Sequence, residues 1–141
     1  MPSRRRIDLK AGRAAVRAWT VSNRAPDLHA PTAATAPDDV PVVDRVTTAT
    51  AVRFTLEELA ARAPGNALEV RVPPFGATQC VEGPTHRRGT PPAVVEMSPE
   101  VWLALACGKL QWADAVAVGD VDASGERSDL SALLPLWAEA L

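Results

Sequence analysis

The spacing of apolar and basic residues near the N-terminus predicts a helix over about residues 6–19. Its apolar stripe would consist mainly of alanines, with Ile7 at the start and Trp19 at the end. The basic residues recur at steps of four, three and four positions: Arg6, Lys10, Arg13 and Arg17. This stripe fits either an anionic surface (lipid headgroups or a nucleic-acid backbone) or the solvated side of a docked helix. We favour the docked helix, because runs of charge usually indicate exposure to solvent.

A change in composition follows this helix. Residues 22–42 contain four prolines among Ala, Thr and Asp, with little apolar periodicity, which is typical of a linker or a long surface loop. Helical spacing returns over about residues 43–63 and ends at Pro64-Gly65-Asn66, since proline cannot continue a helix. The adjacent Glu57 and Glu58 lie mostly off the apolar side of this second helix, and we interpret both as solvated.

The middle of the chain shows the alternation that is typical of strands. Leu68, Val70 and Val72 alternate with charged residues, which predicts a strand with one buried face. Two more strands are expected over about residues 77–82 and 93–97, with turns rather than helices between them. This arrangement predicts antiparallel pairing of the three strands.

The last third of the chain predicts short helices around one more strand. Ser98-Pro99-Glu100 is a strong helix start, because it offers a hydroxyl cap, a proline in the first turn and a carboxylate near the positive end of the helix dipole. This helix would end at Gly108, and a second short helix at Gly119. A strand over residues 121–124 would then lead into a final leucine-rich helix that kinks or restarts at Pro135.

Length, composition and charge narrow the class of protein. The chain has 141 residues with 47% hydrophobic and 23% charged residues, which fits one domain with a buried core. Its net charge of −2 argues against a nucleic-acid binder. No apolar run approaches the roughly 18 residues that a membrane-spanning helix needs. The N-terminus lacks the apolar core of a secretion signal and there are two cysteines, so we expect a cytoplasmic protein.

Residues with the potential for chemistry are few. Two histidines and two cysteines without paired spacing predict no metal site, and no cofactor motif occurs. Cys80 and His86 could together activate a thiolate, but cysteines are common small core residues, so we expect no catalytic residue. In the loop after the second strand, His86, Arg87 and Arg88 could hold a phosphate or carboxylate, or could be polar because they are solvated.

Four consecutive motifs in the last third follow a characteristic order. They are an apolar helix that ends in Gly-Lys-Leu, a short helix that ends in Gly, a strand closed by Gly, and a leucine-rich segment: Ser98–Leu110, Trp112–Gly119, Asp120–Gly125 and Asp129–Leu136. This order resembles the bacterial branch of the sterol carrier protein family. The resemblance covers about residues 98–137 well and residues 67–97 less specifically, and the first helix and the linker lie outside it.

The resemblance implies an α+β fold in which a curved, mostly antiparallel sheet covered by helices encloses an apolar tunnel for a lipid. This domain would span residues 43–141, preceded by a basic N-terminal helix over residues 1–21 and a Pro/Ala-rich linker over residues 22–42. We therefore expect an extra N-terminal helix on a sterol-carrier-protein-like domain.

The function implied is non-enzymatic binding or carriage of a fatty acyl or sterol-like ligand, with no cofactor. The alternative is an accessory or interaction module, similar to the auxiliary domain of mycothiol-dependent isomerases. We expect a hydrophobic small molecule or lipid as partner and no nucleic acid, and a transient membrane contact stays open. The candidate cavity residues are all apolar: Phe75, Trp102, Leu105, Ala106, Trp112, Val116, Leu133, Leu134 and Trp137.

Overall fold

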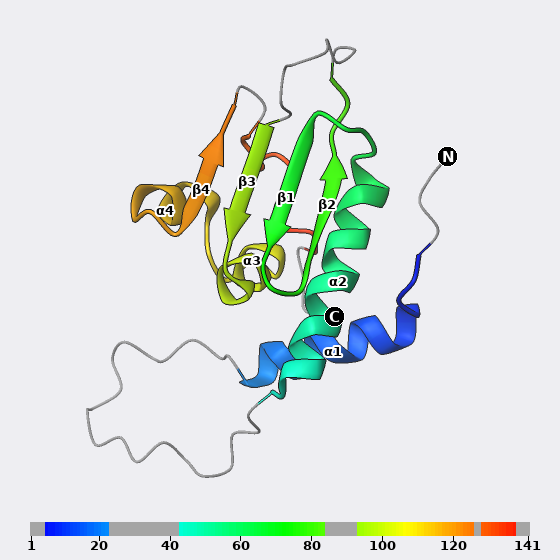
Figure 1. Cartoon of the computed structure of the whole chain (residues 1–141). Coiled ribbons are helices and arrows are strands. Elements are labelled where there is room, and N and C mark those ends of the chain that lie inside the picture. The colour runs from blue at the N-terminus through cyan, green and yellow to red at the C-terminus, as the bar shows by residue number, and fades with distance from the viewer. Residues whose placement is uncertain (1–4, 23–42, 84–92, 126–127, 138–141) are drawn as a thin grey trace, which may run out of the picture.

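The computed structural model describes residues 5–22, 43–83, 93–125 and 128–137. The elements occur in this order: α1 (Leu9–Ser22), α2 (Arg45–Arg62), β1 (Leu68–Val72), β2 (Gly76–Cys80), β3 (Ala93–Met97), α3 (Pro99–Ala106), α4 (Trp112–Ala117) and β4 (Val121–Ser124). The fold is the α+β domain expected from the sequence, with α1 ahead of it (Figure 1). Ser22 belongs to α1, and the rest of the predicted linker, residues 23–42, lies outside the described residues.

The four strands form one sheet in the order β2-β1-β3-β4. Strands β1 and β2 pair antiparallel, as do β3 and β4, so the sheet is mostly antiparallel as expected. The expectation that the first three strands all pair antiparallel is wrong, because β3 lies parallel to β1. The hairpin with β2 occupies one edge of β1, and residues 73–92 are long enough to carry the chain to the other edge.

One face of the sheet is buried and the other is exposed. The buried face consists of alternate residues of the two central strands: Leu68, Val70, Val72, Ala93, Val95 and Met97. Helices α2 and α3 pack against this face (Figure 1). On the other face Arg71 and Glu96 are exposed opposite each other, so the alternation read from the sequence predicts the two faces correctly.

Helix α3 begins and ends where the sequence predicts. The Ser98 hydroxyl accepts a hydrogen bond from the Val101 amide at 3.3 Å, and Pro99 occupies the first turn. After the helix, Gly108 has a φ of 76°, a conformation that glycine adopts without a steric penalty. By contrast, α1 begins later than expected, because Asp8 caps it by accepting a hydrogen bond from the Ala11 amide at 3.1 Å. Arg6 therefore lies before the helix.

Residues 128–137, which we call the C-terminal strap, form turns and not the predicted final helix. Leu130 and Leu136 of the strap are buried, so the apolar residues do mark contacts with the core. Pro135 explains the missing helix, because it has no N–H to donate and its ring would clash with the carbonyl of Ser131. The Leu136 amide instead donates to the Ala106 carbonyl oxygen at 3.0 Å, which joins the strap to the end of α3.

Helix α1 packs across α2 and adds side chains to the core (Figure 1). Ala15, Val16 and Trp19 are buried in this contact. At Gly12 the two helices approach so closely that a Cβ would lie 2.3 Å from the Phe54 ring. Helix α1 is therefore docked on the rest of the molecule, and its cationic side chains lie on its exposed side.

Candidate functional site

The centre of the predicted site is a buried layer between the sheet and the helices. Trp102, Leu105 and Ala106 of α3 lie in it and are at most 1% exposed. The Trp102 indole N–H donates to the Thr55 hydroxyl on α2 at 2.7 Å, and Thr55 donates to the Ala51 carbonyl oxygen at 2.8 Å. Thr55 is the only buried polar residue in the described part of the chain, so this layer offers apolar contact almost exclusively.

A second group of predicted residues lies on the C-terminal strap. Leu133, Leu134 and Trp137 are half-buried and pack against the core. The Trp137 ring stacks on Phe54 of α2, with ring centroids 5.9 Å apart and an angle of 10° between the planes. The strap thus continues the apolar layer toward the surface.

Arg62, on the last turn of α2, ties the strap to the body of the protein. Its Nη1 donates to the Leu136 carbonyl oxygen, and its guanidinium carbon lies 5.6 Å from the Trp137 ring centroid. Its Nε donates to Glu58 at 2.9 Å. These contacts make Arg62 the polar fastener of the strap.

Glu58 links this fastener to the N-terminal end of the described chain. Arg5 donates to the Glu58 carboxylate at 2.6 Å, beside the bond from Arg62. Burial alone would raise the pKa of Glu58, but the hydrogen bonds from Arg62 and Arg5 outweigh it and hold that pKa below its ordinary value. The neighbouring Glu57 accepts hydrogen bonds from the amides of residues 6 and 7.

Sequence reasoning missed these roles and interpreted both glutamates as solvated. Arg5 and Glu58 are 53 positions apart, so no local pattern connects them. A helix-surface carboxylate looks the same in the sequence whether it faces water or a distant arginine. The one local signal was Arg62, which lies four residues after Glu58 at the spacing that favours an ion pair within a helix.

The other predicted cavity residues lie at the margin of the core or on the surface. Phe75 is half-buried at the turn between β1 and β2, and the Arg45 guanidinium carbon lies 5.2 Å from its ring centroid. Trp112 is half-buried at the start of α4. Val116 in the same helix is 44% exposed. The structure therefore buries the α3 residues in the core, packs the strap residues, Phe75 and Trp112 against that core, and leaves Val116 exposed.

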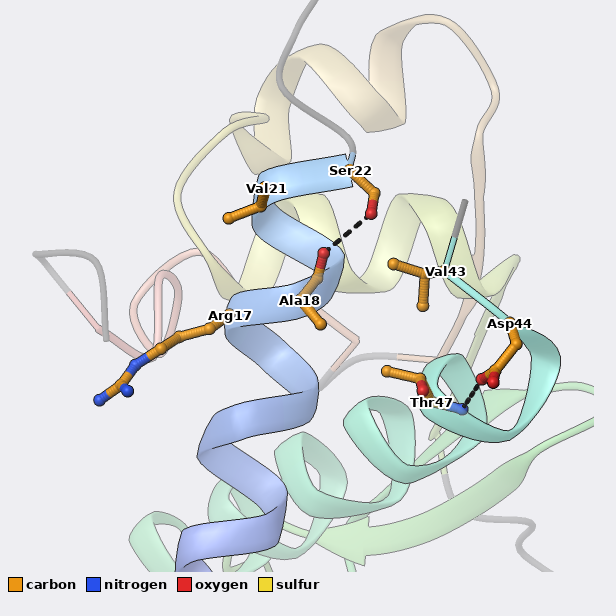
Figure 2. A pocket seen from close by; sticks show the side chains of 7 residues that line it. All are labelled: Arg17, Ala18, Val21, Ser22, Val43, Asp44 and Thr47. Carbon is orange, nitrogen blue, oxygen red and sulfur yellow. Dashed lines mark hydrogen bonds between the residues drawn. The ribbon is translucent and has the colours of Figure 1, made fainter. Parts of the chain in front are cut away.

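A pocket of about 350 Å³ lies between the end of α1 and the start of α2 (Figure 2). Its lining comes from both helices and the residues just before α2: Arg17, Ala18, Val21, Ser22, Val43, Asp44 and Thr47. Asp44 caps α2 by accepting a hydrogen bond from the Thr47 amide at 2.7 Å, and this bond lowers the pKa of Asp44. None of the predicted cavity residues lines this pocket, which forms only where two segments distant in the sequence meet.

The thiols and the candidate anion-binding loop add little to the site. Burial raises the pKa of Cys80 to about 11 and also raises that of Cys107, so neither thiol is activated as a thiolate. His86, Arg87 and Arg88 lie outside the described residues. Within the described residues, no group of three or more His, Cys, Asp or Glu side chains is placed to hold a metal ion.

Together, fold and site define a small α+β domain in which a sheet with one buried face and two packed helices surround an apolar layer. The chain belongs to the bacterial sterol carrier protein family: a family model described as a bacterial SCP ortholog matches residues 44–136. This match confirms the resemblance seen in the sequence, and it leaves α1 outside. No curated protein matches the chain. Within the described ranges, no helix has both the length and the apolar character to cross a membrane.

Proposed function

We propose that the protein binds and carries a hydrophobic ligand of the fatty acyl or sterol-like class and catalyses no reaction. The observation that carries this proposal is membership of the bacterial sterol carrier protein family over residues 44–136. The layer between the sheet and the helices supports it, because Thr55 is its one buried polar residue among those described. Such a layer would select a ligand by apolar area.

In this proposal the ligand lies against α3 and beneath the C-terminal strap, in contact with Trp102, Leu105 and Ala106. Each methylene that leaves water there contributes about 0.8 kcal/mol. An acyl chain of a dozen carbons would gain on the order of 10 kcal/mol before the cost of ordering it is subtracted. The strap is the natural place for entry, because turns and a few hydrogen bonds hold it rather than a helix.

The state of the two thiols supports a carrier without catalysis of its own. A Cys80 thiol with a pKa of about 11 is a poor nucleophile at neutral pH. Both cysteines are free, which supports our proposal of a cytoplasmic location, where thiols stay reduced. The proposal requires no cofactor.

Native mass spectrometry of the protein purified from its own host, followed by organic extraction, tests this function directly. We expect one lipid in a stoichiometric amount. Protein that is reproducibly free of lipid, together with no measurable affinity for a fluorescent fatty acid, would contradict the proposal.

A substitution at Ala106 locates the ligand. Ala106→Phe adds a ring to the buried layer that contains Trp102 and should weaken binding of a fluorescent fatty acid at least tenfold, while costing about 1–3 kcal/mol of stability. The matched control is Ala117→Phe, which adds the same ring at an exposed position of α4 and should leave the affinity unchanged. Equal affinity of the Ala106 variant and the wild type would exclude this layer as the binding site.

The second candidate function is an accessory or interaction module, as expected for a domain that works beside a separate catalytic domain. The complete burial of Trp102, Leu105 and Ala106 favours it, because a layer filled by side chains leaves no room for a ligand. Under this alternative, Ala106→Phe would lower stability, and neither that variant nor the wild type would bind the fatty acid.

A further inference from the structure

The outward side of α1 carries positive charge without any acidic neighbour on the helix. Lys10, Arg13 and Arg17 are exposed, and α1 contains no aspartate or glutamate. The whole chain has a net charge of −2, whereas α1 carries three cations and no anion, so positive charge is concentrated on this helix relative to the rest of the chain, which is net negative. Such concentration creates a local attraction for anions that the net charge does not reveal.

Two of these cations differ from Arg62 on α2 and Arg71 in the sheet, which are held in ion pairs. Arg62 pairs with Glu58, and Arg71 pairs with Glu69 at 2.8 Å. Lys10 and Arg13 form no ion pair with any residue that the structure describes. Their charge is therefore not compensated by the surrounding fold, and a bound partner can use it.

Exposed apolar surface lies beside the cations. Leu9 is 47% exposed and Val21 is 64% exposed. Lys10, Arg17 and Val21 are separated by steps of seven and four positions, which places them along one side of a helix. Figure 2 shows Arg17 and Val21 extending from the same side of α1, next to the pocket that both help to line.

We propose that the outward face of α1 is a docking surface for an anionic lipid bilayer. The phosphates of acidic lipid headgroups attract Lys10, Arg13 and Arg17, and the exposed Leu9 and Val21 enter the headgroup region. A nucleic-acid backbone offers the same charge but no environment for exposed aliphatic side chains. Trp19, the aromatic residue of α1, is buried and cannot stack on bases. The observations therefore favour a lipid surface.

Co-flotation of the whole chain with vesicles tests this surface. We expect binding to vesicles that contain phosphatidylglycerol and phosphatidylcholine, and none to phosphatidylcholine alone. Binding should weaken as salt is added, because salt screens exposed charges. Lys10→Gln/Arg13→Gln should reduce partitioning roughly 25-fold, since each cation near an anionic membrane contributes about fivefold. Val21→Gln should weaken it further through the loss of an apolar contact.

The matched control is Arg53→Gln/Arg71→Gln, which removes the same charge from α2 and the sheet and should change partitioning little. Equal losses in the two double variants would show that only net charge matters and would overturn the proposal. So would the absence of binding to anionic vesicles, or binding of duplex DNA through α1 in place of vesicles. The docking surface does not depend on a carried ligand, and fatty-acid affinity should be the same in the Lys10/Arg13 variant as in the wild type.

Discussion

Helix α3 and the C-terminal strap border the same apolar layer but are held in place in different ways. Helix α3 has a hydroxyl cap and a glycine after its end, and Trp102 in its centre is fully buried. The strap has no regular structure, and it depends on two buried leucines and on contacts from Arg62. Helix α3 is thus part of the core, whereas the strap is a peripheral segment that is held at the edge of the core. This difference predicts that damage to α3 is global, whereas damage to the strap is local.

The largest effect on stability is expected in α3. Trp102→Ala should lower the free energy of unfolding by about 3–5 kcal/mol, because it removes a fully buried ring and the partner of the Thr55 hydroxyl. Urea unfolding followed by far-UV circular dichroism measures this loss. Trp102→Phe keeps most of the ring and loses the hydrogen bond, so it should cost less. A loss below about 1 kcal/mol for the alanine variant would show that α3 is not an essential part of the core.

A smaller and local effect is expected in the C-terminal strap. Arg62→Gln should change the free energy of unfolding by no more than about 1 kcal/mol, since its ion pair is partly exposed. Hydrogen exchange at the Leu136 amide should become faster, because the strap loses its polar fastener. Arg71→Gln breaks a comparable ion pair on the exposed face of the sheet and should leave exchange in the strap unchanged. A uniform increase in exchange rate over the whole molecule would contradict the distinction between α3 as part of the core and the strap as a peripheral segment.

The smallest effect is a dependence of the fastener on pH. The pKa of Glu58 is lower in the folded protein than in the unfolded chain, so its stabilising contribution is present above the unfolded value and is lost as pH falls through the folded one. We expect an advantage of wild type over Glu58→Gln of less than about 1 kcal/mol near neutral pH, because the group is partly solvated. This difference should vanish in acid. A difference that persists in acid strong enough to protonate the carboxylates of the folded protein would show that the carboxylate charge is not responsible.

The elements predicted correctly are those whose signals are local. The cap at Ser98, the glycine that follows α3 and the alternation of β1 each act within a few residues, so the sequence alone determines them. The apolar character of Trp102 likewise predicts its burial, because its neighbours on the same side of α3, Leu105 and Ala106, are apolar as well.

The features that sequence reasoning missed depend on distant partners. Strand β3 pairs with β1 because the hairpin already occupies the other edge, and nothing inside β3 encodes that choice. The strap contains helical spacing, but Pro135 and the bond from Leu136 to Ala106 decide its conformation. The pocket between α1 and α2 arises from a contact between helices, so its lining has no signature in either helix alone.

The close contact at Gly12 has a consequence for which residues the folded unit must include. Similarity to the family starts at residue 44, yet the Phe54 ring is covered by α1, which approaches so closely that position 12 has no space for a side chain. A chain shortened to the family boundary would leave that ring and its buried neighbours on α2 in water. Apolar surface uncovered in this way favours self-association. The boundary of the family match at residue 44 therefore separates α1 from α2, although the contact between these two helices is part of the protein interior.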